Sequence, residues 1–487
     1  MGSNVLIVLA DQFRADCLGV AGNPDVRTPA LDGLARDGVQ YSNSFCVAPL
    51  CSPSRYTLLT GRLPAEHGVH ENNLPLSRRL LTLPERVREI GMRSSAVGKM
   101  HFEPTYMDSG FATMRLCEQN GDGRLVDDYH ADLLEAGLVD VVDLVDQRAD
   151  YRRRANASYW NSFGTAVSDL PERWHSTSWT ADNAISLMDE GWSHGGQLMY
   201  LSFVKPHHPF DPPDPWHQAY DPDELTVLPG WTSHVPDQDT RAGFFNNKSL
   251  TESDLRKVMA MYYGSISHLD FHLARILRHL RAIDAYDNTM IIFTSDHGEY
   301  LGFHHMILKT GPMYDPVIRV PLIIKPSESA GPQTWPSGVH RDERLVSGAD
   351  VVPTALACLG LTAPELSGHD LADPTWTRDV VVAQSGHSDF MARTKTAKLL
   401  RHGEQSLFFD LQSDPSELHP ASSLPNPSDH RLLERETKAL STLTTQDQTS
   451  ETRGPDPKAP RQEADTHNER GRRFDELVSA ANHPWLT

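Results

Sequence analysis

The chain has 487 residues and a formal net charge of −20, with 39% hydrophobic and 23% charged residues. This length accommodates one large core and a smaller domain, and the composition is ordinary for a globular protein. The acidic balance argues against nucleic acid or an anionic membrane as a partner. Any anionic substrate must therefore be held by a local cationic pocket.

Two further features concern location. The apolar runs are far shorter than the roughly 20 residues of a membrane span, and an apolar strand already begins at Val5, so we expect no signal peptide. The five cysteines are few, odd in number and widely spaced, which is typical of reduced thiols. We therefore expect a cytoplasmic protein.

Buried strands and helices alternate along most of the chain. The apolar patterns predict strands at 5–9, 93–97, 198–204, 289–294 and 320–325, and helices near 28–38, 84–90 and 252–283. Continuous apolar strands that alternate with helices are typical of an α/β protein with a large, mostly parallel sheet flanked by helices. In such sheets, functional side chains gather at the carboxyl ends of the strands.

The pattern changes near residue 375. Short strands are predicted at 380–384, 397–402 and 406–411, with no long helices between them. We therefore predict an α/β domain over residues 1–375 and a smaller C-terminal subdomain with an antiparallel sheet over residues 376–487.

The end of the chain is polar. Residues 412–466 are rich in Ser, Thr, Pro, Gln and acids, so we predict a largely mobile tail with one helix at 429–443. A short docking helix is expected at 474–481. The tail from residue 430 onward is a candidate surface for homo-oligomer formation.

Residues 51–62 carry the strongest functional signal. They read Cys-Ser-Pro-Ser-Arg-Tyr-Thr-Leu-Leu-Thr-Gly-Arg, with Pro53 and Arg55 at fixed offsets from Cys51. This run resembles the signature of the type I sulfatases, a family of the alkaline phosphatase superfamily. The resemblance implies that a maturation enzyme oxidises Cys51 to formylglycine, whose hydrated aldehyde attacks the sulfate ester. Because short motifs also occur by chance, the interpretation depends on partners elsewhere in the chain.

Two acidic pairs follow predicted strands, Asp11-Gln12 and Asp296-His297. An Asp after a strand is more often a turn former than a ligand, but carboxylates that meet at one sheet edge suit a hard divalent cation. The resemblance implies that these four residues hold one metal together with the formylglycine from Cys51. Many sulfatases have Asp and Asn where this chain has Gln12 and His297, and the pairs here look more like choline sulfatases and phosphonate monoester hydrolases. We expect calcium, with manganese as the alternative because of the imidazole.

Three cationic residues are expected beside Cys51. Arg55 lies one helical turn later, so it returns to the same face of a helix that begins at Cys51. The resemblance implies that Arg55 orients the formylglycine diol and offsets charge at the metal. Gly98-Lys99-Met100-His101 resembles the family's Gly-Lys-x-His element. It implies that Lys99 binds sulfate, and that His101 binds the diol and later accepts its proton.

Two further sequence motifs complete the set of expected site residues. Pro206-His207-His208-Pro209 resembles the family's Pro-His-x-Pro element, which assigns His207 to sulfate and leaves His208 open between a structural and a substrate-rim role. A Leu-Gly-x-His stretch at 301–304 leads to Lys309, the implied second sulfate-binding lysine. The departing alcohol would take its proton from His207 or Lys309. A substrate contact by His304 or His305 stays open.

The resemblance, over residues 4–411, implies a sulfuric ester hydrolase that releases inorganic sulfate from an organic sulfate monoester, either a carbohydrate or a small alkyl or aryl sulfate. The alternative is a phosphonate monoester hydrolase or phosphodiesterase of the same superfamily. Those relatives carry neutral residues where this chain has Lys99 and His101, which favours the sulfatase. A third interpretation treats Cys51 as an ordinary thiol in a binding protein.

Overall fold

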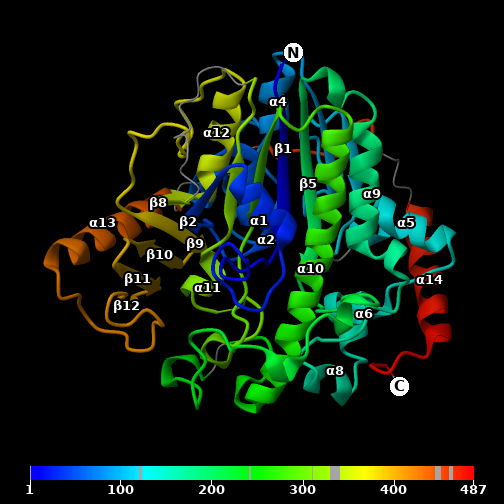
Figure 1. Cartoon of the computed structure of the whole chain (residues 1–487). Helices are drawn as coiled ribbons and strands as arrows, with labels where there is room; N and C mark the ends of the chain where they lie inside the picture. The colour runs from blue at the N-terminus through cyan, green and yellow to red at the C-terminus, as the bar shows by residue number, and fades with distance from the viewer. Residues whose placement is uncertain are drawn as a thin grey trace.

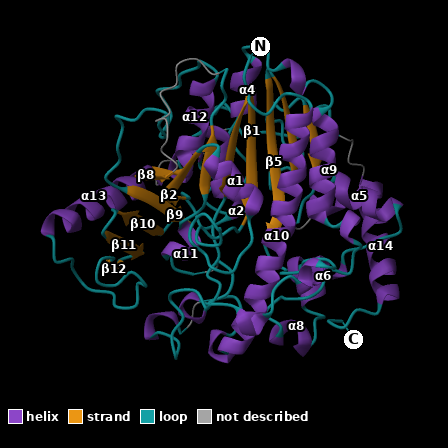
Figure 2. Ribbon diagram, viewed as in Figure 1, coloured by secondary structure: helices purple, strands orange, loops and turns teal. Residues whose placement is uncertain are grey.

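The computed structural model describes residues 2–119, 123–240, 243–309, 311–329, 341–444, 451–459 and 464–486. A large sheet runs through the centre between layers of helices, and a second, smaller sheet lies to one side (Figures 1 and 2). None of the described helices combines the length and the apolar composition that a membrane span requires.

The large sheet has eight strands in the order β4-β3-β5-β1-β6-β7-β2-β8. These are β1 (Asn4–Asp11), β2 (Val39–Phe45), β3 (Arg93–Gly98), β4 (Thr113–Leu116), β5 (Gln197–Pro206), β6 (Thr289–Ser295), β7 (Leu322–Lys325) and β8 (Arg341–Ser347). All neighbouring strands are parallel except β7, which runs antiparallel to both β6 and β2. The predicted α/β class with a mostly parallel sheet is confirmed.

The two faces of the sheet are covered by different helices. Along the fully buried strand β1, Leu6 and Val8 pack into the core shared with α1 (Pro29–Arg36), α9 (Ser176–Met188) and α10 (Glu252–Ala282). Their neighbours Val5 and Ile7 point to the opposite core, shared with α2 (Cys51–Thr60), α4 (Leu83–Arg88) and α12 (Val351–Cys358). Because both faces are buried, the central strands are apolar throughout instead of alternating.

Shorter helices lie in the connections between these elements. They are α3 (Pro64–His67), α5 (Asp128–Glu135), α6 (Val141–Gln147), α7 (Ala149–Arg152), α8 (Ala157–Asn161) and α11 (Asp315–Ile318).

The smaller sheet is antiparallel, as predicted, with the order β12-β11-β10-β9. Its strands are β9 (Val381–Ser385), β10 (Asp389–Arg393), β11 (Ala397–His402) and β12 (Gln405–Asp410), and α13 (Pro427–Thr444) packs against it. The sequence patterns had missed β10, whose short apolar centre is flanked by Asp389 and Arg393. The domain boundary at residue 375 stays a prediction.

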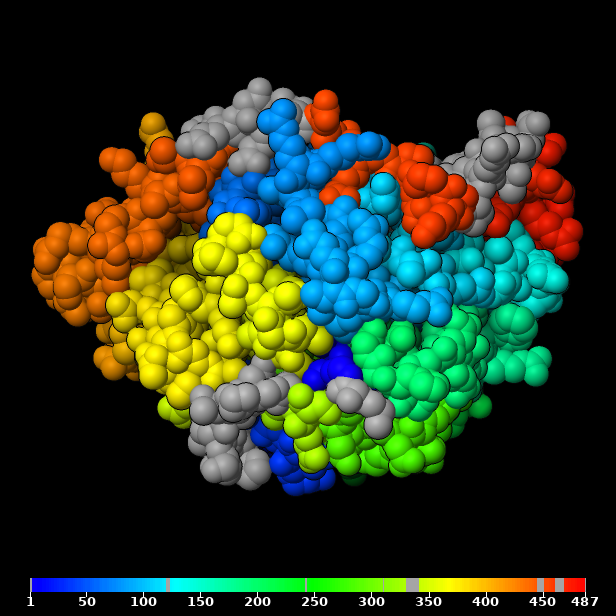
Figure 3. All heavy atoms as spheres, turned by 90° about the horizontal axis from the view of Figure 1, so that it is seen from above, coloured from blue at the N-terminus to red at the C-terminus, as the bar shows by residue number. Residues whose placement is uncertain are grey.

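The mobility of the tail stays a prediction, but within it residues 451–459 make defined contacts with the rest of the chain. This segment forms isolated β-bridges between Thr452 and Ser77 and between Pro455 and Met107. Figure 3 shows the orange-red segment beside the light-blue residues that it contacts. An ion pair anchors the segment: Arg453 is only 6% exposed and lies 2.7 Å from the Glu85 carboxylate. Residues 445–450 and 460–463 lie outside the described residues, and α14 (Ala464–Ala481) follows.

We expect Arg453→Ala to lower the free energy of unfolding by about 3 kcal/mol, because it leaves the Glu85 carboxylate without its partner. Arg453 also donates to the carbonyls of Leu80 and Asp108, which lose their donor. Denaturant titration measures the change. Arg78→Ala is the matched control, since the exposed Arg78 side chain donates to the Thr452 carbonyl of the same segment, and its backbone hydrogen bond to the Glu451 carbonyl survives the substitution; equal losses in the two variants would contradict the prediction.

Candidate active site

The predicted site residues meet at the carboxyl edge of the large sheet. Asp11 ends β1, Lys99 follows β3 and Asp296 follows β6, while His207 follows β5. These strand ends point downward in Figure 1, where α2 begins beside the end of β1. The topology therefore brings together residues that are far apart in the sequence.

Cys51 is the first residue of α2. The preceding Leu50 is extended, and Gly61 ends the helix in the left-handed conformation with φ 71°. All ten helix residues are buried, so the polar ones among them face partners inside the protein. The unpaired backbone N–H groups at a helix start favour negative charge, which suits an ionised side chain at this position.

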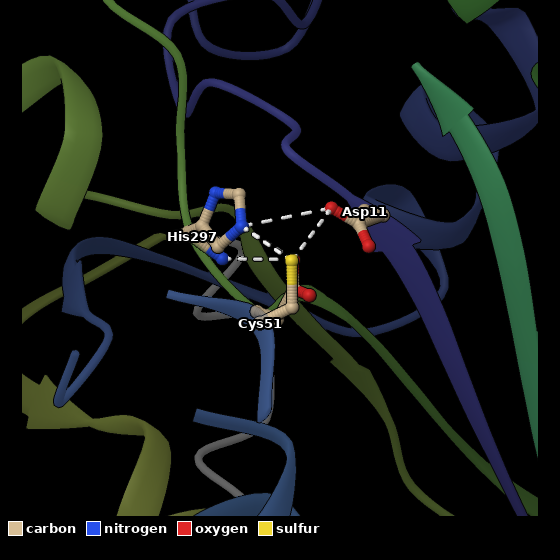
Figure 4. A group of neighbouring side chains, drawn as sticks. Asp11, Cys51 and His297 are labelled. Carbon is tan, nitrogen blue, oxygen red and sulfur yellow. Dashed lines mark hydrogen bonds and ion pairs between the residues drawn. The ribbon is translucent and has the colours of Figure 1, made fainter. Parts of the chain in front are cut away.

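The Cys51 sulfur is surrounded by charged and polar groups. Its Sγ lies 3.1 Å from Lys309 Nζ, 3.3 Å from His297 Nε2 and 3.9 Å from Asp11 Oδ1. Figure 4 shows the Asp11 carboxylate and the His297 ring turned toward the sulfur. Burial alone would raise the pKa of the thiol, but Lys309, Lys99 and His297 outweigh burial and hold the pKa well below its ordinary value. Cys51 is therefore set apart from the other cysteines, whose pKa values burial raises.

Two carboxylates share one buried guanidinium. Arg55 lies 3.0 Å from Asp11 Oδ2 and 2.8 Å from Asp296 Oδ2, and all three side chains are almost fully buried. Lys99 Nζ adds a second cation 2.7 Å from Asp11. Burial opposes ionisation of Asp11, but Lys99, His207 and Arg55 hold its pKa well below the usual range. Arg55 thus offsets charge between the two predicted metal ligands.

The donor set fits a divalent cation. Ligand atoms of Asp11, Cys51, Asp296 and His297 all lie within 4.8 Å of one another. The Gln12 amide nitrogen donates to the Glu299 carboxylate, while the buried Oε1 of Gln12 has no hydrogen-bond partner among the described residues. An amide oxygen that is oriented in this way and otherwise unpaired is suited to bind a metal.

The hydrogen bonds of His207 fix its tautomer. Its Nδ1 lies 2.7 Å from the His208 carbonyl oxygen, which can only accept, so Nδ1 carries the ring proton. The other nitrogen, Nε2, lies 2.6 Å from Lys309 Nζ and must accept. On this side of Cys51, the proton donor is therefore the ammonium group of Lys309.

His101 and Lys99 are held by residues that our sequence analysis missed. The backbone N–H groups of Met100 and His101 donate to Glu118 Oε1 at 2.9 and 3.0 Å, and the His101 side chain hydrogen-bonds to Cys51. Lys99 Nζ also donates to Gln119 at 3.2 Å. Glu118 and Gln119 lie just past the end of β4, and this strand-end position was the available signal.

The remaining histidines separate into different roles. The ring of His208 stacks on His207 at 4.3 Å between centroids and hydrogen-bonds through Nδ1 to the buried Asp146, so it packs directly behind the site. His304 is fully buried, and its two nitrogens contact Asp239 and the Ser416 carbonyl, each at 2.7 Å. His304 is thus a structural residue, and its ring is not available to a substrate.

The chain is similar to known proteins over most of its length. The sulfatase family model matches residues 3–361. An arylsulfatase from Clostridium perfringens is 29% identical over 448 residues, covering 86% of this chain and 90% of that protein. The multifunctional alkaline phosphatase superfamily protein PehA from Trinickia caryophylli is 28% identical and covers 74% of each chain.

Among solved structures, the phosphonate monoester hydrolase of Agrobacterium radiobacter superposes with a TM-score of 0.72 at 24% identity, covering 93% of this chain and 99% of that one. At this identity the superposition supports the fold alone, whereas the family model spans the strand ends that carry the site. The chain therefore belongs to the sulfatase family of sulfuric ester hydrolases.

Proposed function

We propose that this protein releases inorganic sulfate from an organic sulfate monoester, using a formylglycine formed from Cys51 and one divalent metal. The observation that carries the proposal is the convergence of cations on the Cys51 sulfur: Lys309 contacts it directly, and Lys99 lowers its pKa. Preorganised cations around a nucleophile are what a reaction at a sulfate group requires, because negative charge develops on its oxygens and the leaving group.

Two groups would complete the site. Asp11, Gln12, Asp296 and His297 would hold the metal, which when bound polarises a sulfuryl oxygen and favours ionisation of the nucleophile. The formylglycine supplies a hydrated aldehyde as that nucleophile, after oxidation of Cys51 by a maturation enzyme. Three of the four side-chain donors offer oxygen, which favours calcium, while the imidazole of His297 leaves manganese as the alternative.

The chain's own residues bind the substrate and move its protons. Lys99 contacts Asp11, and Lys309 contacts His207 and Cys51; the ammonium groups of both lysines would bind the sulfate oxygens. Lys309 would protonate the departing alcohol, because His207 Nε2 accepts a hydrogen bond from it and carries no proton of its own. His101, which hydrogen-bonds to Cys51, would act as the base for the regeneration of the nucleophile.

A second candidate function is hydrolysis of phosphonate monoesters. The superposition on a phosphonate monoester hydrolase and the Gln12 and His297 pairings motivate it. The buried Lys99, fully enclosed beside Asp11, favours the sulfatase, because phosphonate monoester hydrolases are expected to carry a neutral residue at this position. A sulfated carbohydrate or a small alkyl or aryl sulfate is the proposed substrate class.

The test is to co-express the chain with a formylglycine-generating enzyme and to analyse the peptide that contains Cys51 by mass spectrometry. We expect an aldehyde at residue 51, and faster turnover of an aryl sulfate than of phenylphosphonate. Chelation should abolish both activities, and restoration by calcium or by manganese would identify the metal. An unmodified thiol throughout would contradict the formylglycine, while faster phosphonate turnover would favour the second candidate.

A further inference from the structure

A second group of metal-binding side chains lies outside the active site, where α10 packs against α9. His268 and His272 are four residues apart on α10, so their rings lie on the same face of the helix. Glu172, in the 3-10 helix η2 (Glu172–Trp174), reaches both rings, and Ser178 of α9 lies beside them. Nothing in the reaction described above uses these residues.

Four ligand-type atoms converge here at nearly equal separations. Glu172 Oε1 lies 2.9 Å from His272 Nε2, 3.1 Å from His268 Nε2 and 3.0 Å from Ser178 Oγ. The two Nε2 atoms are 3.1 Å apart, and Ser178 Oγ lies 3.1 Å from His272 Nε2 and 3.4 Å from His268 Nε2. Six nearly equal distances among four atoms define a nearly regular tetrahedron.

We propose that Glu172, His268 and His272 bind a zinc ion, with the Ser178 hydroxyl or a water molecule at the fourth corner. A tetrahedron with these edges has its centre about 1.9 Å from each corner, close to the ~2.0–2.1 Å of zinc–nitrogen and zinc–oxygen bonds. The Ser178 hydroxyl donates its proton to the Glu172 carbonyl at 2.6 Å, so its lone pairs are free to face the centre.

The cluster is buried but remains accessible to an ion from solvent. Both histidine side chains are almost fully buried, whereas the Glu172 side chain is 36% exposed and leaves a path from solvent. Each histidine presents Nε2 and Glu172 presents a carboxylate oxygen, which are ligand atoms that zinc binds.

One residue competes with the ion. Arg275 Nη1 lies 2.9 Å from His272 Nδ1, and since a guanidinium only donates, the ring proton of His272 is on Nε2. Zinc would bind at Nε2, the ring proton would move to Nδ1, and Arg275 would turn away. Arg275 already contacts Asp182 at 2.7 Å and is 33% exposed, so it has another partner when it leaves the ring.

Zinc binding to the full-length protein, measured with excess calcium present, tests the site. We expect one zinc ion whose affinity falls about 100-fold or more in His272→Ala and in His268→Gln. His279→Ala is the matched control, because His279 lies on the same helix beside Asp189, and it should bind zinc as the wild type does. Arg275→Gln keeps all three ligands and should bind zinc more tightly.

Thermal unfolding gives an independent measurement. Comparing the Tm of each variant with and without zinc removes differences in the stability of the metal-free proteins. Zinc should raise the Tm of the wild type and of His279→Ala, because the ion joins η2 and the start of α9 to α10. It should leave the Tm of His272→Ala unchanged. Equal zinc affinity in His272→Ala and His279→Ala, or no zinc-dependent rise in the wild-type Tm, would overturn the proposal.

Discussion

Replacing Cys51 by alanine should lower turnover of an aryl sulfate by about 10⁴-fold or more, because the variant has no side chain that can become the nucleophile. The cations and the carboxylates around residue 51 stay in place, so the variant should still bind the metal. Two measurements check this: steady-state sulfate release, and the calcium-dependent rise in Tm. Turnover should disappear while the Tm rise persists.

Cys358→Ala is the matched control for that experiment. Cys358 is buried as Cys51 is, but it ends α12 near Ser3, at the amino-terminal edge of the sheet. Its removal should leave turnover within about a factor of two of the wild type, since surface and core changes away from a site act mainly on stability. Comparable activity in Cys51→Ala and Cys358→Ala would show that the reaction does not pass through residue 51.

The second large effect is expected at Arg55. In Arg55→Ala, two fully buried carboxylates, Asp11 and Asp296, lose their shared guanidinium, and Ser202 loses a donor at 2.9 Å. Removal of one partner from a buried ion pair costs about 3–5 kcal/mol, so the metal-free protein should lose about that much free energy of unfolding. Calcium should restore part of the loss, because the ion compensates the same two carboxylates.

Denaturant titration with chelator and with calcium measures these changes. Arg115→Ala is the control: Arg115 also pairs with two carboxylates, Asp128 and Asp132, but its side chain is 34% exposed. Its loss should cost less than about 1 kcal/mol, as for other solvated pairs. If the two variants lost equal stability, the buried guanidinium would not be holding the two carboxylates together.

Much of the fold could be predicted because both sheet faces are buried. Continuous apolar runs located β1, β5 and β6 to within a few residues, and their alternation with helices identified the α/β class. Strand direction is not encoded in such a run, so the antiparallel β7 could not be distinguished from its parallel neighbours. The contacts of residues 451–459 could not be predicted for a related reason: composition shows that a segment is polar, but not that one arginine finds a buried partner.

For the site, the sequence could predict which residues lie close together. The motifs placed Cys51, Lys99 and His207 near the metal-ligand pairs, and the structure brings them together. The carboxylates that hold the site in place were not predictable, because Glu118 and Glu299 act through backbone and amide hydrogen bonds that depend on the three-dimensional arrangement. The tautomer of His207, on which the proposed role of Lys309 depends, likewise follows only from the position of a carbonyl oxygen.

The complete burial of α2 has a consequence for how the active protein can be made. Cys51 is 1% exposed, and β5 and β6, which border its pocket, are synthesised long after it. A modifying enzyme that must bind residues 51–55 cannot reach them in the folded protein, where they are buried. On the proposed function, conversion belongs to the growing or unfolded chain, so protein purified in the unconverted state would need to be unfolded before a maturation enzyme could act on it.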